Sequence, residues 1–270
     1  MHGVVERGWR PADVRCEGDG VSERRERATR TTSSATTVSA PAKLTLSLRV
    51  TGVRPDGYHL VDAEMVSLDL ADELTFSEGT GMAIEGDPGL GAVDPHDNLV
   101  RRALRTVGRD AHVVLRRRIP AGGGLGGGSS NAAAVLRWAG CDDLSAAAAL
   151  GADVPFCLAG GRARVTGIGE VLEPLPYERR TFTLAMPPFG CSTPAVYAAW
   201  DELGGPTAEG PNDLEPAALV VEPRMAAFRD ALGDATGVTP QLAGSGSTWF
   251  VPGAFPGDRR IVARTVPAYG

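Results

Sequence analysis

The 270-residue chain lacks long apolar segments, and this absence narrows the classes of protein to which it can belong. No window reaches the roughly 18 consecutive apolar residues that a membrane-spanning helix needs. The N-terminus lacks the apolar stretch of a secretory signal, and six acidic residues between Glu6 and Glu26 argue against a transit peptide. We therefore predict a cytoplasmic protein without a membrane partner.

Cysteine is also scarce. The four cysteines, at positions 16, 141, 157 and 191, include no Cys-x-x-Cys pair. Their spacing is typical neither of a disulfide framework nor of a zinc site. We interpret all four as reduced thiols, and the sequence leaves any metal ligands unknown.

Lysine and asparagine are among the scarce residue types that carry chemistry. The chain has 26 arginines but a single lysine, Lys43, and its asparagines are only Asn98, Asn131 and Asn212. Arginine cannot supply a compact ammonium group on a slim stem, so the surviving lysine marks a position where a substitute would not have served. The alternative is survival by chance. The net charge of −6 disfavours a nucleic-acid partner.

The pattern of elements predicts an α+β fold of two lobes. Residues 1–38 are polar and aperiodic, so we predict a disordered tail, followed by lobes at 39–165 and 166–270. Residues 43–50 alternate polar and apolar, which predicts a strand with Leu44, Leu46, Leu48 and Val50 inward. Further strands are predicted at 60–76, 112–116, 162–165, 181–186 and 248–251. Helices are predicted at 98–107 (capped by Asp97), 129–138, 144–150, 193–203 and 223–232. The mixture has no regular βαβ repetition.

A glycine-rich loop at residues 120–131 carries the strongest functional signal. It holds six glycines in seven residues and runs directly into a predicted helix that begins with Ser129 and Ser130. Glycines let backbone N–H groups turn toward phosphate oxygens, and the helix N-terminus favours the same anion. The serine hydroxyls could donate to phosphate or bind Mg²⁺. A flexible linker would not explain why a helix follows at once.

Two other phosphate-binding patterns fit less well. Gly122, Gly124 and Gly127 satisfy G-x-G-x-x-G, and Asp142 follows at the distance that a dinucleotide site requires, but no strand precedes that aspartate. No Gly-Lys-Ser or Gly-Lys-Thr closes the loop, which argues against a P-loop NTPase. The basic run 116–118 just before the loop either is a solvated strand end or helps to bind phosphate.

Four blocks of sequence, in order along the chain, resemble the GHMP kinases. They are Pro41-Ala-Lys-Leu with Arg54-Pro-Asp-Gly-Tyr-His59, then 119–133, Gly151-Ala-Asp-Val-Pro-Phe156 and Ala243-Gly-Ser-Gly246. The resemblance implies a two-lobed kinase with ATP and Mg²⁺ in the cleft between the lobes. The Pro55-Asp-Gly-Tyr-His59 segment and the Gly-Gly-Gly-Ser-Ser-Asn form of the loop most resemble the branch that phosphorylates the 2-hydroxyl of a cytidine diphosphate-linked methylerythritol.

The resemblance also implies roles for individual residues. Lys43 and Asp153 would be the catalytic pair, with the carboxylate as general base. The residues implied to bind ATP are Asn98, Arg117, Pro120, Ala121, Gly122, Gly123, Gly124, Leu125, Gly126, Gly127, Gly128, Ser129 and Ser130. Those implied to bind the substrate are Thr45, Tyr58, His59, Thr193 and Tyr197. From sequence alone, the alternatives remain that Asp153 is a helix cap, Lys43 a solvated strand end, and His59 a general base or a turn residue.

The chain departs from the family pattern at a few positions. Thr45 stands where asparagine is usual beside the substrate, and Ala243 replaces a serine. The segment between Trp138 and Gly151 and the C-terminus are shorter than usual, and the tail is extra. These departures concern substrate contacts and lobe packing and leave Lys43 and Asp153 in place. Another GHMP kinase activity, or a nucleotide-binding module without catalysis, remains the alternative.

Overall fold

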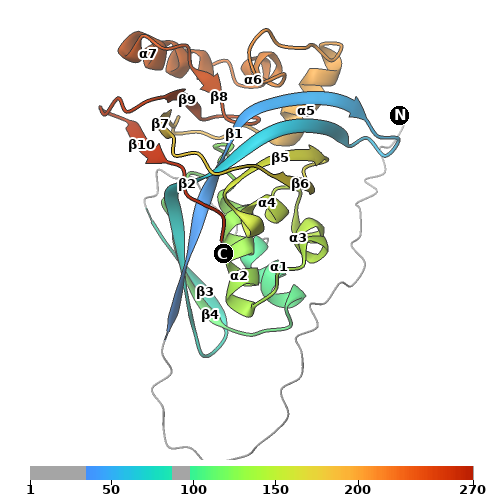
Figure 1. Ribbon diagram of the computed structural model, residues 1–270, viewed down its shortest axis with the longest axis vertical. Helices are drawn as coiled ribbons and strands as arrows, with labels where there is room; N and C mark the ends of the chain where they lie inside the picture. Colours follow the sequence, from blue (N-terminus) through green and yellow to red (C-terminus); the bar gives the residue numbers. More distant parts are fainter. Residues whose placement is uncertain (1–34, 87–97, 270) are drawn as a thin grey trace, which may run out of the picture.

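The computed structural model describes residues 35–86 and 98–269, which form two β-sheets with helices packed on each (Figure 1). The larger sheet contains β1 (Thr36–Val53), β2 (His59–Ser77), β3 (Gly81–Glu85), β4 (His112–Arg116), β5 (Arg162–Gly167) and β6 (Val171–Pro174). The smaller sheet contains β7 (Thr181–Ala185), β8 (Gln241–Leu242), β9 (Trp249–Pro252) and β10 (Arg260–Arg264). This arrangement confirms the predicted α+β class.

The long hairpin of β1 and β2 is the spine of the larger sheet. The two strands pair antiparallel from Thr36↔Phe76 to Val53↔His59. The other edge of β2 pairs antiparallel with β5 near Val61 and with β4 near Glu73. β2 also meets the chain that leaves the smaller sheet, because Leu68 forms an antiparallel bridge with Thr265, the residue after β10.

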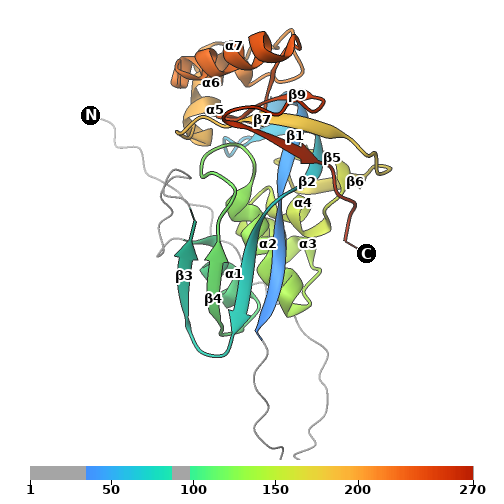
Figure 2. The same ribbon diagram turned by 90° about the vertical axis from the view of Figure 1, so that its left-hand side faces the viewer.

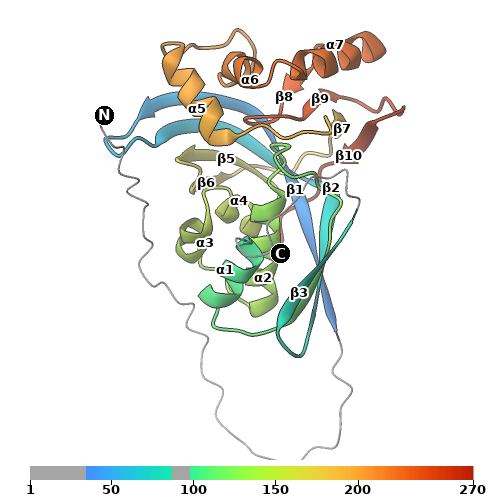
Figure 3. The same ribbon diagram turned by 180° about the vertical axis from the view of Figure 1, so that it is seen from behind.

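The helices form two groups, one beside each sheet, and the views from the side and from behind agree on this (Figures 2 and 3). Packed on the larger sheet are α1 (Leu99–Thr106), α2 (Gly127–Ala139), α3 (Leu144–Leu150) and α4 (Val154–Ala159). Beside the smaller sheet lie α5 (Thr193–Glu202), α6 (Glu215–Val221) and α7 (Met225–Thr236). Within residues 35–86 and 98–269, no helix combines the length and apolar character that crossing a bilayer needs.

The predicted strand 43–50 is the middle of β1, but its simple alternation is wrong. Leu44 and Leu48 are buried, whereas Leu46 and Val50 are only half-buried, and Lys43 on the polar face is also buried. Register shifts between Pro41 and Lys43 and between Thr45 and Ser47 interrupt the alternation. Both faces of this stretch are also covered, since Leu44 and Leu48 belong to different apolar clusters.

Several helix ends differ from the prediction. α1 is capped by Asn98, whose Oδ1 accepts a hydrogen bond from the Val100 N–H at 2.9 Å, and the predicted cap Asp97 lies outside the described residues. The sequence analysis missed α4 because it interpreted Pro155 as a break. Proline is tolerated in a first helical turn, and Pro155 stands there.

The predicted lobe boundary at residue 165 falls inside the larger sheet. β6 follows that boundary but pairs with β5, and Thr265 and Ala268 bridge back to Leu68 and Gly160. The second half of the chain therefore contributes to both sheets. Of the predicted tail, residues 1–34 lie outside the described residues, and β1 begins at Thr36.

The cysteine prediction is confirmed in part. Cys157 and Cys191 are free and buried. Cys141 is disulfide-bonded, so the interpretation of four reduced thiols is wrong for this residue, and Cys16 lies outside the described residues.

Candidate active site

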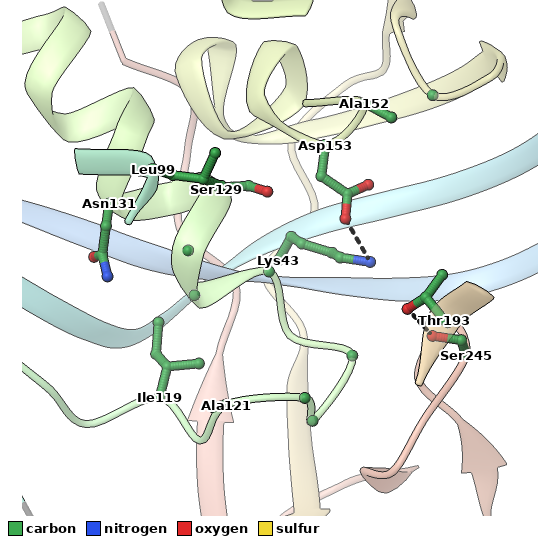
Figure 4. A pocket seen from close by; sticks show the side chains of 18 of the residues that line it. Lys43, Leu99, Ile119, Ala121, Ser129, Asn131, Ala152, Asp153, Thr193 and Ser245 are labelled. Atoms are coloured by element: carbon green, nitrogen blue, oxygen red, sulfur yellow. Dashed lines mark hydrogen bonds and ion pairs between the residues drawn. The ribbon is translucent and has the colours of Figure 1, made fainter. Parts of the chain in front are cut away.

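A cleft of about 540 Å³ lies where the two sheets meet, and both halves of the chain line it. Lys43 reaches it from β1, and Asp153 from the turn before α4. The glycine-rich loop forms one wall, and Thr193 and Ser245 belong to the other (Figure 4). The structure thus brings together residues that are up to about two hundred positions apart in the sequence.

Lys43 and Asp153 face each other in this cleft. Lys43 Nζ lies 3.4 Å from Asp153 Oδ2 and 3.1 Å from Thr45 Oγ1, to which it donates a hydrogen bond (Figure 4). Lys43 is only 6% exposed, so it is not the solvated strand-end lysine that the sequence left open. A buried ammonium group needs such a partner, because an unpaired charge is costly to bury.

The carboxylate of Asp153 is directed into the cleft and is not used as a helix cap. The residue occupies the N-cap position of α4, but its side chain makes no capping hydrogen bond. Its side chain is 33% exposed, so one side remains open to a ligand. The helix-cap alternative for Asp153 therefore does not describe its side chain.

The glycine-rich loop is held by its backbone from both sides. Lys43 N–H donates to the Leu125 carbonyl at 3.0 Å, Cys191 N–H to Gly122 at 3.0 Å and Thr248 N–H to Gly123 at 3.2 Å. At Gly124, φ is +75° and an added Cβ would lie 2.2 Å from the Ala243 carbonyl oxygen. The close approach of the Ala243–Gly246 block, together with the positive φ, requires glycine at this position.

Helix α2 begins directly behind the loop. Gly126 occupies its N-cap with φ of 67°, and the N-terminus has no side-chain cap that would occupy its N–H groups. Ser129 lines the cleft, whereas Ser130 is buried and its hydroxyl donates to the Pro41 carbonyl. Of the two serines predicted to contact phosphate, only Ser129 thus presents a hydroxyl to the cleft.

The end of the cleft predicted to hold adenine contains Asn98 and Arg117, together with Leu99 and Ile119. Asn98 is 6% exposed, and its Oδ1 is used by the cap of α1. Arg117 donates from Nη2 to the Ile119 carbonyl at 3.2 Å. The structure therefore places both predicted residues beside an apolar slot.

Asp72 and Asn131 are buried polar residues of this wall that the sequence analysis missed. Asp72, 1% exposed, accepts hydrogen bonds from the backbone N–H groups of Arg118 at 2.7 Å and Ile119 at 2.8 Å. Asn131 Nδ2 donates to its second oxygen at 3.0 Å. The carboxylate thus fixes the entry to the glycine-rich loop against α2. The survival of Asn131 among three asparagines was the available signal.

The opposite wall is made of side chains from α5 and the loop before β9. Thr193 and Tyr197, both predicted to bind the substrate, line the cleft, and Thr193 Oγ1 lies 2.7 Å from Ser245 Oγ. Burial, with a smaller contribution from the Asp153 charge, raises the pKa of Tyr197 to about 12. Tyr197 therefore stays a neutral hydrogen-bonding group at any physiological pH.

His59 is part of an aromatic cluster behind this wall. Its ring stacks on Tyr197 with centroids 4.6 Å apart and meets the edge of Trp200 at 5.6 Å. His59 Nε2 lies 2.8 Å from Asp201 Oδ1. Neither His59 nor Tyr58, which is 46% exposed, is among the residues that line the cleft. The sequence analysis missed Trp200, Asp201 and the hydroxyl of Ser245.

The chain that forms this cleft is similar to a family of known proteins. Residues 98–161, from the cap of α1 to just beyond α4, match the family model of the GHMP kinases N terminal domain. The chain is 41% identical over 234 residues to the 4-diphosphocytidyl-2-C-methyl-D-erythritol kinase of Paracoccus denitrificans, covering 78% of this chain and 85% of that protein. It is 38% identical over 248 residues to the Ruegeria pomeroyi kinase of the same name, covering 81% and 88%.

Solved structures agree. A crystal structure of 4-(cytidine 5'-diphospho)-2C-methyl-D-erythritol kinase superposes with a TM-score of 0.69 at 30% identity, covering 85% of this chain and 98% of that one. A mevalonate kinase with 12% identity and a TM-score of 0.52, covering 86% and 99%, shares the fold. The chain is therefore a small-molecule kinase of the GHMP kinase family and belongs within it to the 4-diphosphocytidyl-2-C-methyl-D-erythritol kinases.

Proposed function

We propose that the protein transfers the γ-phosphoryl group of ATP to the 2-hydroxyl of 4-diphosphocytidyl-2-C-methyl-D-erythritol. The observation that carries the mechanism is the contact of Lys43 Nζ and Asp153 Oδ2, 3.4 Å apart in the cleft that the glycine-rich loop lines. The substrate is the one named by the relatives that match most of this chain. In this proposal the reaction takes place in the cytoplasm, and the protein binds small molecules as its partners.

In the proposed reaction, Asp153 accepts the proton of the substrate hydroxyl. The hydroxyl oxygen then forms a bond to the γ-phosphorus as the bond from that phosphorus to the bridging oxygen of ADP breaks. Lys43 lies beside the oxygen that gains negative charge and stabilises it electrostatically. Thr45 keeps the ammonium group in place through the hydrogen bond to its hydroxyl. Phosphoryl transfer depends mainly on such positioning and charge neutralisation.

The backbone of residues 120–128 and the start of α2 would bind the triphosphate. The N-terminus of α2 has no side-chain cap, so its N–H groups and helix dipole favour an anion there. Ser129 presents its hydroxyl to the same space. The loop is anchored to both halves of the chain by the backbone hydrogen bonds of Leu125 and Gly122, which would keep the phosphates fixed relative to Asp153.

The residues present also fit a Mg²⁺ ion that arrives with ATP. Among the residues that the structure describes, no group of three or more His, Cys, Asp or Glu side chains could hold a metal by itself. Magnesium that takes most of its ligands from phosphate and water needs only one or two protein oxygens. Ser129 would supply one through its hydroxyl, which leaves the Asp153 carboxylate to accept the proton, and the ion would neutralise phosphate charge.

The wall of Thr193, Tyr197 and Ser245 would hold the acceptor substrate. Its hydroxyl groups suit a polar sugar alcohol, and the ring of Tyr197 is backed by His59. A flat apolar face with polar neighbours suits the cytosine end of the proposed substrate. The exposed Tyr58 would contact that base if the loop before β2 moved toward the cleft.

Coupled detection of ADP release tests the proposal with a panel of acceptors. We expect turnover with 4-diphosphocytidyl-2-C-methyl-D-erythritol and none above background with mevalonate, homoserine or galactose. Turnover with one of the other acceptors instead would favour a different GHMP kinase activity. ATP binding without turnover on any of them would show a nucleotide-binding module and refute the proposal.

A further inference from the structure

A second cavity, of about 310 Å³, lies between α1 and the strands β3 and β4. Among the residues that the structure describes, it shares no lining residue with the active-site cleft. Apolar side chains from all three elements line it, namely Met82, Val100, Leu104 and Val113. A cavity of this volume is large enough for a small organic molecule.

Three arginines line the same cavity. Arg101 and Arg105 lie four residues apart and therefore share one face of α1. The chain then turns at Gly108, whose φ is +60°, and the Arg109 N–H donates to the Leu104 carbonyl at 3.1 Å. This turn keeps the third arginine at the end of the helix, so three guanidinium groups belong to one cavity.

These three arginines have no carboxylate partner among residues 35–86 and 98–269. Arginines elsewhere in this part of the chain do pair, as Arg164 does with Asp62 at 2.8 Å. Asp110 also lines the cavity, but no ion pair joins it to any of the three. The lining therefore keeps an excess of positive charge, although the whole chain has a net charge of −6.

The position of Arg101 is unfavourable without a bound anion. Arg101 Nε is buried and donates no hydrogen bond to any described residue. The residue stands in the first turn of α1, where the helix dipole disfavours a cation, whereas Arg105 stands in the last turn, where it favours one. Helix electrostatics thus explain Arg105 but not Arg101, and a buried unpaired charge is costly. A negatively charged ligand would satisfy both residues.

Arg109 is held in place by an aromatic ring. Its guanidinium carbon lies 5.5 Å from the centroid of the Trp138 ring, and this ring stacks on Phe76 with centroids 4.4 Å apart. Contact with the face of a guanidinium leaves the N–H groups at its edge available. The planar N–H fork of arginine matches two oxygens of a phosphate group.

We propose that the cavity between α1, β3 and β4 binds a small organic anion that carries a phosphate or diphosphate group. Arg101, Arg105 and Arg109 donate to the phosphate oxygens, and the organic part contacts the apolar lining. Because the cavity is separate from the active-site cleft, this anion binds in addition to the substrates of the kinase. The inference does not rest on the identity of the acceptor substrate.

Isothermal titration of sodium diphosphate into the wild-type protein saturated with ADP tests the proposal. ADP occupies the active-site cleft, so the titration reports binding elsewhere. We expect one diphosphate to bind per chain with a Kd of about 1 mM or lower, and more weakly as the salt concentration rises. Absence of binding in this range, or binding only with release of ADP, would overturn the proposal.

Arg105→Gln and Arg102→Gln are a matched pair of variants. Both remove one positive charge from α1, but only Arg105 is among the residues that line the cavity. Loss of a charge-assisted hydrogen bond should weaken diphosphate binding about 10-fold in Arg105→Gln and less than about 3-fold in Arg102→Gln. Equal weakening would show attraction to the helix as a whole and would contradict a site. Should Arg105→Gln fail to fold, Arg109→Gln replaces it, because Arg109 is also exposed and lines the cavity.

Butyl phosphate and inorganic phosphate test the apolar part of the cavity. Both are titrated into the ADP-saturated protein in the same way. The ester should bind about 3-fold or more tightly than inorganic phosphate, because its methylene groups would be buried against Met82 and Leu104. Binding of the ester no tighter than that of inorganic phosphate would contradict the assignment of an organic ligand.

Discussion

The two walls of the cleft are built in different ways. The wall that would bind ATP consists mainly of the backbone of one continuous segment, 120–128, held by main-chain hydrogen bonds. The wall that would bind the acceptor consists of side chains from separate segments, such as Tyr197 on α5 and Ser245 before β9. A backbone wall requires glycines at fixed positions, whereas a side-chain wall requires only that distant segments fold together. The first is the more sensitive to a single added methyl group, and the second is the more adaptable.

Among substitutions that test this difference between the walls, Gly124→Ala in the backbone wall is expected to cause the largest loss of stability and nucleotide affinity. Gly124 has φ of +75°, and the new Cβ would lie 2.2 Å from the Ala243 carbonyl oxygen and 2.9 Å from that of Gly246. The left-handed conformation alone costs about 1–2 kcal/mol, and the contact with fixed backbone adds to it. We expect Tm to fall by about 4 °C or more and ADP affinity to fall about 10-fold or more.

Gly128→Ala is the matched control for the folding effect. Gly128 lies in the first turn of α2, has no positive φ, and the nearest atom to its new Cβ would be Leu99 Cδ1 at 3.6 Å. Its Tm should stay within about 1 °C of wild type or rise, because alanine favours the helix. Equal losses of Tm in thermal unfolding of the two variants would contradict the special role of Gly124.

A smaller effect is expected in the side-chain wall from Tyr197→Leu. This change removes the ring that stacks on His59 at 4.6 Å and lines the cleft. Since an aromatic pair contributes about 0.5–1.5 kcal/mol, we expect KM for the cytidyl substrate to rise about 3- to 10-fold. KM for ATP should not change, because the two ligands use opposite walls.

Tyr177→Leu is the control for losing a tyrosine. Tyr177 is 47% exposed and is not among the residues that line the cleft. Steady-state kinetics should show both KM values of this variant unchanged. If Tyr197→Leu raised KM for ATP as much as KM for the acceptor, the division of the cleft into two walls would be wrong.

The smallest effect concerns alkaline stability. Burial and the Asp153 charge raise the pKa of Tyr197 to about 12, above its ordinary value of 10. Between these two values the unfolded chain releases the phenolic proton while the folded chain retains it, so the free energy of unfolding falls as pH rises. Below that range the phenol is neutral in both states and contributes no pH dependence.

Urea denaturation of wild type and Tyr197→Phe at pH 8, 9, 10 and 11 measures this contribution. The variant should lose less stability than wild type between pH 10 and 11, and the two should respond alike below pH 9. Parallel loss in both proteins across the whole range would show that the folded environment does not hold this proton.

The same difference between the walls explains how much of the site the sequence could predict. The glycine-rich loop and the helix after it stand together in the sequence, and the structure places both at the cleft. Lys43 and Asp153 were predicted from sequence blocks, and the structure brings them into contact. Trp200 and Asp201 belong to no such block, and Ser245, although it stands in the fourth block, was given no role, because the contacts of all three follow from how α5 and the β8–β9 loop pack.

The sequence also predicted some elements of the fold better than others. Strands and helices with clear periodicity, such as 112–116 and 144–150, were predicted at their observed bounds. Alternation failed in β1, where register shifts and a cover on both faces bury Lys43 together with Leu44. Short elements such as β6 and α4 were missed, because too few residues carry their period and tertiary packing stabilises them.

Single-turnover phosphoryl transfer by Asp153→Asn tests most directly whether the carboxylate between the two walls acts as the general base. The asparagine keeps the shape of the side chain but cannot accept the hydroxyl proton, so the rate constant of the transfer step should fall about 10²- to 10⁴-fold. ADP affinity should stay within about 3-fold of wild type, because the phosphates are held by the glycine-rich loop. A variant that transfers phosphoryl at near the wild-type rate would contradict the account.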